Sequence, residues 1–235
     1  MNFLLHRHLA VRDLGAPLAG IGAMLPDLWR MADRRVRAAR RAASDDERPA
    51  DVAAVLAGVA HHLEVDRWFH AAPVFVEGER LAGERIRNSG SAAPKLALFG
   101  HIAWELCLDG ALVRRAGLEP TLRALHEGFA AAEQGAARAA AALHHFDRHA
   151  RSAAERDAFE AGMRQLFAEI SRGPWIAGYQ HGAGIAQRID GVRRRLGFPR
   201  LEPDERARFG DALETLTAHA DAALAGIEAM PRADQ

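Results

Sequence analysis

Two short stretches of the sequence carry histidine and carboxylate side chains one helical turn apart. His62, Asp66 and His70 follow one another at intervals of four residues, and His101 and Glu105 have the same spacing. Residues four apart lie on one face of a helix, so each stretch can present its polar groups to a single point. Imidazole nitrogens bind Zn, Fe and Mn, and carboxylates suit harder cations. The spacing therefore predicts a site for one or two divalent metal ions.

The residues around these groups favour a buried position. The stretch from Leu96 to Leu108 is apolar nearly all round, which is typical of a buried helix. A buried carboxylate is costly unless it is paired or bound to a metal. We therefore expect Glu105 and Asp66 to be metal ligands. A network of hydrogen-bonded polar groups, with arginines as partners, is the alternative.

Other candidates for the same site lie nearby in the sequence. His6 interrupts an apolar N-terminal segment, and Asp27 follows a short apolar stretch. We include both as metal ligands, although Asp27 alone could instead cap a helix. His61 points to another helix face than His62 and is, with His70, a candidate for moving protons during catalysis. Asp66 completes the predicted catalytic set.

A third feature is the aromatic stretch Trp175–Tyr179, which is followed by Arg188. Guanidinium groups form paired hydrogen bonds with phosphate oxygens. We expect Arg188 and Tyr179 to contact a phosphorylated substrate. The alternative for the arginine is a position on an exposed helix face.

Composition limits the class of protein. The chain has 235 residues, with 31 basic and 31 acidic side chains, so its formal net charge is zero. This balance argues against general binding to nucleic acids, which needs a basic excess. Cys107 is the only cysteine, so no disulfide can form within the chain, and we expect a cytoplasmic protein. We expect no membrane span, because we find no apolar window that approaches the roughly 20 residues that span a bilayer.

The sequence predicts an all-α protein with about eight or nine helices. Aromatic residues are 6% of the chain, alternating β-branched runs are missing, and good helix formers dominate. We expect a single helical bundle over residues 1–200, with a C-terminal helix from 201–235 packed on it. The segment 77–93 is ambiguous. Helices are expected at about 2–12, from Pro26 into 30–42, and at 50–70, 94–116, 119–149, 152–171, 175–196 and 203–229.

The order of these motifs resembles the acyl carrier protein phosphodiesterase family. Met1–His6 is similar to that family's opening Met-Asn-Phe-Leu-Ala-His, and Gly22–Asp27 to its Gly-Asn-Leu-Leu-Ala-Asp segment. The stretch His62–Asp66 is similar to its His-Arg-x-Ile-Asp motif. Trp104 falls where the family has an aromatic residue, and Trp175–Tyr179 resembles its Trp-Leu-x-x-Tyr.

This resemblance implies an HD-type, all-helical, metal-dependent phosphohydrolase, with manganese as the usual metal. It implies that the metal site is formed by His6, Asp27, His62 and Asp66. It also implies that the substrate is a phosphoester, with acyl carrier protein as a candidate carrier of that ester. Where the family has a second acid, this chain has His70. The donor set is thus richer in imidazole, which leaves Mn, Fe and Zn as candidate metals.

A second, weaker resemblance is to zinc-dependent phospholipases C and the related single-strand nucleases. They have a His-x3-Asp motif with a further histidine, and then His-x3-Glu. His62, Asp66 and His70, followed by His101 and Glu105, have that order. Both resemblances imply hydrolysis of a phosphoester by metal-activated water. A helical metal-binding module without catalytic activity is the alternative from another class.

Overall fold

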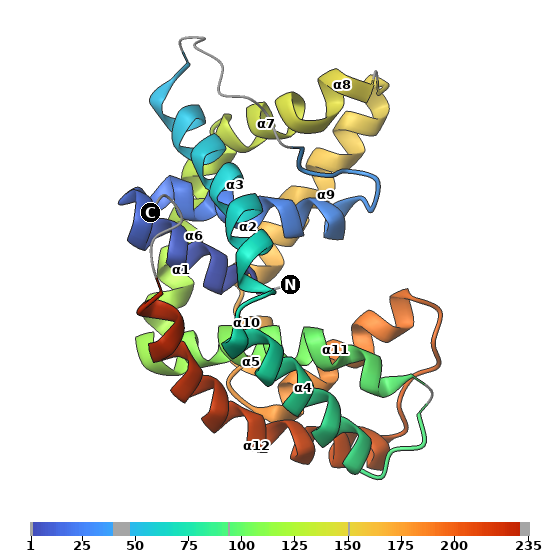
Figure 1. Ribbon diagram of the computed structural model, residues 1–235. Coiled ribbons are helices and arrows are strands. Elements are labelled where there is room, and N and C mark those ends of the chain that lie inside the picture. Colours follow the sequence, from blue (N-terminus) through green and yellow to red (C-terminus); the bar gives the residue numbers. More distant parts are fainter. Residues whose placement is uncertain (1, 40–47, 94, 150, 231–235) are drawn as a thin grey trace. The chain divides into compact units, whose positions relative to one another are not determined.

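The computed structural model describes residues 2–39, 48–93, 95–149 and 151–230 of the chain, and every regular element in these ranges is a helix (Figure 1). The predicted all-α class is confirmed. Nine of the helices in these ranges have twelve or more residues, in agreement with the expected eight or nine. In chain order the elements are α1 (Phe3–Leu14), α2 (Pro17–Ala32), α3 (Ala50–Phe69), α4 (Pro73–Asn88), η1 (Leu96–Phe99), α5 (Gly100–Ala116), α6 (Leu118–Glu133), α7 (Ala136–Ala141), η2 (Ala142–Phe146), α8 (Asp147–His149), α9 (Ala153–Ser171), α10 (Pro174–Gly178), α11 (Gly182–Arg195) and α12 (Pro203–Glu228).

The helices form two compact units. The first, here called the α5 unit, consists of Phe69–Thr121 and Gly173–Met230 together with Asn2. The second, here called the α3 unit, consists of Phe3–Trp68 and Leu122–Arg172. The expected C-terminal helix is α12, and it belongs to the α5 unit.

Helix α5 is the central element of its unit and packs against α4, α11 and α12 (Figure 1). The most apolar 18-residue window of the stretch Leu96–Ala116 has a mean hydropathy of 1.5. By length and composition the stretch could therefore cross a membrane, contrary to the sequence expectation that no such window exists. In the structure, 72% of its most apolar window is buried. Its apolar character is accounted for by the core of the α5 unit, because three neighbouring helices cover it.

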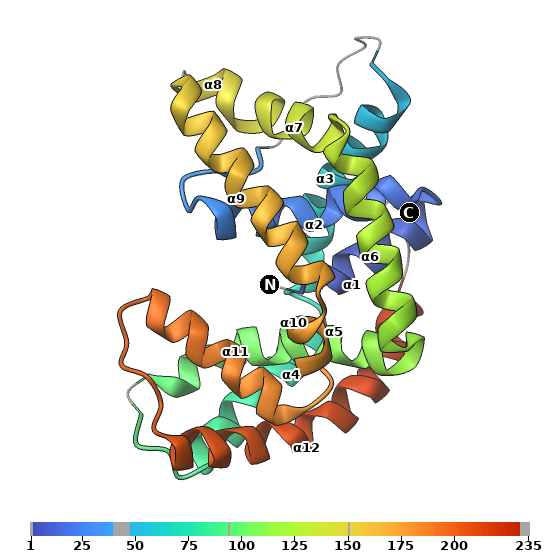
Figure 2. The same ribbon diagram turned by 180° about the vertical axis from the view of Figure 1, so that it is seen from behind.

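The α3 unit is assembled on α2, which packs against α1 and α9 (Figure 2). Helices α2 and α3 approach each other closely at two glycines. A Cβ atom on Gly58 would lie 1.9 Å from the carbonyl oxygen of Ala19, and one on Gly22 would lie 2.1 Å from that of Val55. Only glycine permits backbones to pack this closely. The contact fixes the part of α3 that carries the first group of candidate ligands.

The predicted start of the second helix at Pro26 is wrong. Helix α2 begins at Pro17, a residue whose fixed φ angle suits the first turn and whose missing N–H needs no partner there. Pro26 lies inside the helix and is buried. The helix ends at Ala32, and residues 33–39 are not helical, contrary to the expected continuation. The expected segment 40–42 lies outside the described residues.

Two other predicted helices are interrupted. The expected helix at 119–149 breaks after α6, where Gly135 has a φ of 137°, a value that side chains with a Cβ rarely adopt. The expected helix at 175–196 is divided into α10 and α11 by a turn at Tyr179–His181. Most of the ambiguous segment 77–93 belongs to α4, which begins at Pro73 and ends at Asn88.

Candidate functional site

His6, His62 and Asp66 form the first group of potential metal ligands, here called the His6 trio. Each residue offers one donor atom, and these atoms lie within 4.8 Å of one another. Nε2 of His6 is 3.2 Å from Oδ1 of Asp66, and Nε2 of His62 is 3.4 Å from Oδ2. The rings of the two histidines lie against each other at a tilt of 32°, with centroids 3.9 Å apart. The histidines are buried, while the side chain of Asp66 is 39% exposed, so solvent reaches the trio on the carboxylate side.

The protein fixes the protonation of these rings. Nδ1 of His62 donates a hydrogen bond of 2.8 Å to the carbonyl oxygen of Ala23 on α2. A carbonyl can only accept, so in the neutral ring the lone pair is on Nε2, which faces Asp66. Burial, together with the charge of His62, lowers the pKa of His6 to about 4. His6 is therefore neutral at pH 7 and can act as a ligand.

The ring nitrogens of His6 are in the state expected of a metal-ligating histidine when no metal is bound. Both of its ring nitrogens are buried, and neither makes a well-aligned hydrogen bond to a described residue. Buried polar atoms normally have a partner, and an exception calls for an explanation. Burial raises the pKa of the Asp66 carboxyl, but its interactions with the nearby imidazoles of His6 and His62 outweigh burial and hold that pKa far below its usual value. The trio thus combines a carboxylate with at least one neutral imidazole.

His70, His101 and Glu105 form the second group, here called the Glu105 trio. Their donor atoms also lie within 4.8 Å of one another. Oε1 of Glu105 is 3.4 Å from Nε2 of His101 and 3.6 Å from Nε2 of His70. The carboxylate side chain is only 4% exposed, whereas the two histidine side chains are 36% and 33% exposed. Burial raises the pKa of Glu105, but hydrogen bonds from the histidines help to hold it well below its usual value, so the carboxyl group is ionised.

Two neighbours of the Glu105 trio were missed by the sequence analysis. Oε2 of Glu79 on α4 lies 3.4 Å from Nδ1 of His101. Phe75, also on α4, packs against the rings of His70 and His101 at centroid distances of 4.7 and 5.0 Å. A carboxylate behind a ligating histidine orients the ring and raises its basicity. The segment 77–93 gave no clear helix signal, so the sequence offered no means of placing Glu79 beside His101.

Two further residues of the predicted metal and catalytic set, Asp27 and His61, lie outside both trios. Asp27 is close enough for its negative charge to raise the pKa values of His6 and His62, but it is not part of the trio. Nε2 of His61 is 2.9 Å from Oδ2 of Asp13 on α1, and both side chains are 4% exposed. His61 is thus hydrogen-bonded to Asp13 within the α3 unit, and its predicted catalytic role stays a prediction.

The predicted substrate-contacting residues lie together in the α5 unit. Tyr179 is completely buried, and burial raises its pKa to about 12, partly offset by the charge of Arg188. The guanidinium carbon of Arg188 lies 3.5 Å from the ring centroid of Trp175. The arginine is therefore oriented by an aromatic ring and lies close to the tyrosine hydroxyl.

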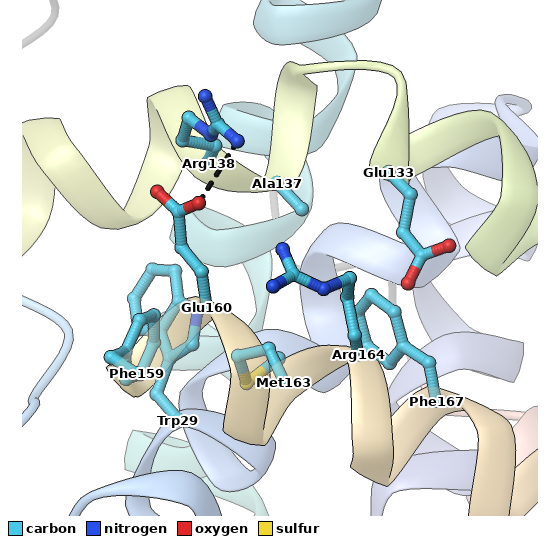
Figure 3. A pocket seen from close by; sticks show the side chains of 9 residues that line it. All are labelled: Trp29, Glu133, Ala137, Arg138, Phe159, Glu160, Met163, Arg164 and Phe167. Carbon is cyan, nitrogen blue, oxygen red and sulfur yellow. Dashed lines mark ion pairs between the residues drawn. The ribbon is translucent and has the colours of Figure 1, made fainter. Parts of the chain in front are cut away.

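A separate cavity of about 270 Å³ lies in the α3 unit, between α2, α7 and α9 (Figure 3). Its floor is apolar and its rim is charged, with Nη2 of Arg138 paired to Oε2 of Glu160 at 2.9 Å. The guanidinium of Arg164 extends over the cavity in Figure 3. None of the predicted site residues lines this cavity. Its lining consists of Trp29, Glu133, Ala137, Arg138, Phe159, Glu160, Met163, Arg164 and Phe167.

Both trios have the chemical composition of a metal site that retains free coordination positions. Structural zinc sites are usually closed by four protein ligands, whereas catalytic sites have three and leave a position for water or substrate. Two imidazoles and one carboxylate occur in such catalytic sites for zinc and for iron. In each trio at least one side chain is partly exposed. The described residues therefore contain two groups that could each hold a metal ion and remain reachable from solvent.

Comparison of the chain with protein-family models, with curated proteins and with solved structures gave no match. The two family resemblances drawn from the motifs thus remain expectations, and the argument for function rests on the geometry of the trios.

Proposed function

We propose that this protein is a metal-dependent hydrolase of phosphoesters, most plausibly of a phosphodiester. The observation that carries the proposal is the formation of two separate His/His/carboxylate trios, one in each compact unit. Two groups of this composition are an unusual outcome for a purely structural polar network, because each buries charged or polar groups at a cost in free energy. The motif resemblance supplies the reaction class.

The side chains around each trio support the same reading. The carbonyl of Ala23 fixes the tautomer of His62, and Glu79 lies behind His101, as partners of ligating histidines do. Bound at such a trio, a divalent cation would neutralise phosphoryl oxygens and lower the pKa of a water molecule to make it a nucleophile. His70 is a candidate to transfer a proton, since it is one-third exposed beside Glu105.

The identity of the bound metal would distinguish between the two families that the sequence resembles. Manganese would agree with the acyl carrier protein phosphodiesterase family, whose substrate would then be a phosphodiester on a carrier protein. Zinc is the second candidate, because two imidazoles per carboxylate form a donor set that zinc favours. A module that binds metal but hydrolyses nothing is the remaining alternative.

Elemental analysis of the purified protein tests the proposal. We expect up to one equivalent of Mn, Fe or Zn per trio after incubation with each ion. Asp66→Ala should abolish binding at the His6 trio alone, and Glu105→Gln at the Glu105 trio alone. Asp51→Ala removes a carboxylate from the first turn of the same helix as Asp66 and is the matched control. It should retain full binding.

Hydrolysis of bis(p-nitrophenyl) phosphate, a generic phosphodiester, is the second measurement. We expect activity that is lost with a chelator and restored by the metal found in the elemental analysis. Full activity after complete removal of metal would refute the proposal. Stoichiometric metal without hydrolysis of any phosphoester in a broad panel would instead identify a non-catalytic module.

A further inference from the structure

A group of arginines on and after α11 makes no ion pair with a described carboxylate. Elsewhere, exposed arginines are often paired, as Arg80 is with Glu77 and Glu84 on α4. Among the described residues, no carboxylate lies within ion-pair distance of Arg188, Arg194 or Arg200. This local excess of positive charge is notable in a chain whose formal net charge is zero.

Arg188 is held in one orientation, and no carboxylate among the described residues lies within ion-pair distance of it. Its guanidinium stacks on Trp175 at 3.5 Å from the ring centroid. Nε and Nη2 are shielded from solvent and have no hydrogen-bond acceptor among the described residues. A guanidinium in this situation is costly unless an anion compensates it. It lines a pocket of about 220 Å³ whose walls include Gly178, Gly184 and Gly191.

A larger pocket of about 500 Å³ adjoins the first, because Gln187 and Gly191 line both. Three arginines line it, namely Arg194, Arg200 and Arg206. The one acid in its described lining is Asp190. Oδ1 of Asp190 accepts a hydrogen bond of 2.9 Å from the backbone N–H of Leu201, and Oδ2 lies 3.9 Å from Nη1 of Arg206. The acid is thus already engaged, and the pocket stays positively charged.

The chemistry of the two pockets selects the ligand. Arginine groups bind phosphate oxygens in pairs and with defined geometry. The N-terminus of α11 is not the anion site, because the N–H of Gly182 already donates to the carboxylate of Glu214. Concave pockets of this size suit a small molecule rather than an extended polymer. We propose that these adjoining pockets bind a small phosphorylated molecule with two phosphate groups, one at Arg188 and one among Arg194, Arg200 and Arg206.

Calorimetric titration with pyrophosphate, compared with inorganic phosphate, tests this site. The titrations contain a chelator, so metal bound at either trio does not contribute, and the result is independent of the proposed hydrolase activity. Pyrophosphate should bind about tenfold or more tightly than phosphate, because a charge-assisted hydrogen bond contributes enough free energy for such a factor.

Arg188→Gln and Arg194→Gln should each weaken pyrophosphate binding about tenfold. Arg188→Lys retains the charge but not the paired donors, and it should fall between wild type and Arg188→Gln. Arg208→Gln makes the same change of net charge at an exposed position of α12 that lines neither pocket, and it should change affinity less than about twofold.

Equal weakening by Arg208→Gln would refute the site, since binding would then depend on net charge alone. Equal affinity for phosphate and pyrophosphate would refute the two-phosphate ligand, and tighter binding of a DNA duplex than of pyrophosphate would replace the small molecule by a nucleic acid. Circular dichroism verifies folding of each variant. If Arg188→Gln fails to fold, the exposed Arg194 provides the same test.

Discussion

Replacing Gly58 by alanine should show how the close approach of α2 and α3 maintains the His6 trio. The added Cβ would lie 1.9 Å from the carbonyl oxygen of Ala19 and 2.8 Å from the backbone nitrogen of Ala23. Both obstacles are backbone atoms, so no change of side-chain rotamer relieves the clash and the helices must separate. The carbonyl oxygen of Ala23 also accepts the hydrogen bond that orients His62. The substitution is therefore expected to affect both stability and metal binding.

The magnitude follows from two opposing terms. In a helix interior, alanine is favoured over glycine by about 1 kcal/mol. Overpacking at a close-packed position costs about 1–3 kcal/mol, and the upper end applies where backbone atoms collide. We expect a net loss of about 2 kcal/mol in the free energy of unfolding. For a chain of this size the unfolding midpoint should then fall by about 4–8 °C.

Gly226→Ala is the matched control. Gly226 is in the last turn of α12, and an added Cβ would meet no atom within 4 Å. Only the helix-propensity term applies, so this variant should be as stable as wild type or more stable by up to about 1 kcal/mol. Thermal unfolding followed by circular dichroism measures both effects. If Gly58→Ala were stabilised as much as Gly226→Ala, the close contact of α2 and α3 and the argument built on it would be wrong.

Two other predictions concern buried titratable groups. Burial raises the pKa of Asp13, but hydrogen bonds from Arg12 and His61 outweigh burial and hold that pKa below its usual value. The pairing therefore stabilises the fold at neutral pH. This contribution is lost as pH falls below about 4. The difference in unfolding free energy between wild type and Asp13→Asn, from urea titrations, should be constant from about pH 5 upward and shrink below about pH 4; a constant difference down to pH 2 would contradict it. Burial also raises the pKa of Cys107 to about 12, so a disulfide reagent at pH 8 should label this thiol only after denaturation. Rapid labelling of the native protein would show that α5 is not buried as described.

Local pattern was sufficient to predict the all-α class and two histidine–carboxylate pairs. Spacing of four residues places His62 with Asp66, and His101 with Glu105, on the same helix faces, and the structure retains both pairs. The apolar surroundings correctly predicted that Glu105 is buried. These properties depend on residues close in sequence, where helix geometry alone fixes the separation.

Contacts between distant segments were decided only by tertiary structure. Asp27 was predicted to be a ligand, but the rotation of α2 leaves it beside the His6 trio, and the course of α2 itself was misjudged because Pro26 is accommodated inside the helix. Pairing of His61 with Asp13, and of Glu79 with His101, depends on which helices pack together.

Sequence by itself determined which residues could share a helix face, because that geometry is local. The addition of His6 to the His62–Asp66 pair was decided by the packing of helices, in which α2 and α3 meet at Gly22 and Gly58 without side chains between their backbones. Tertiary structure also decided that Arg188, Arg194 and Arg200 have no ion pair among the described residues. Whether an arginine is paired depends on carboxylates that can be far from it in the sequence. For Arg188, the residue proposed to bind phosphate, the fold supplies an aromatic support, and Nε and Nη2 have no acceptor among the described residues.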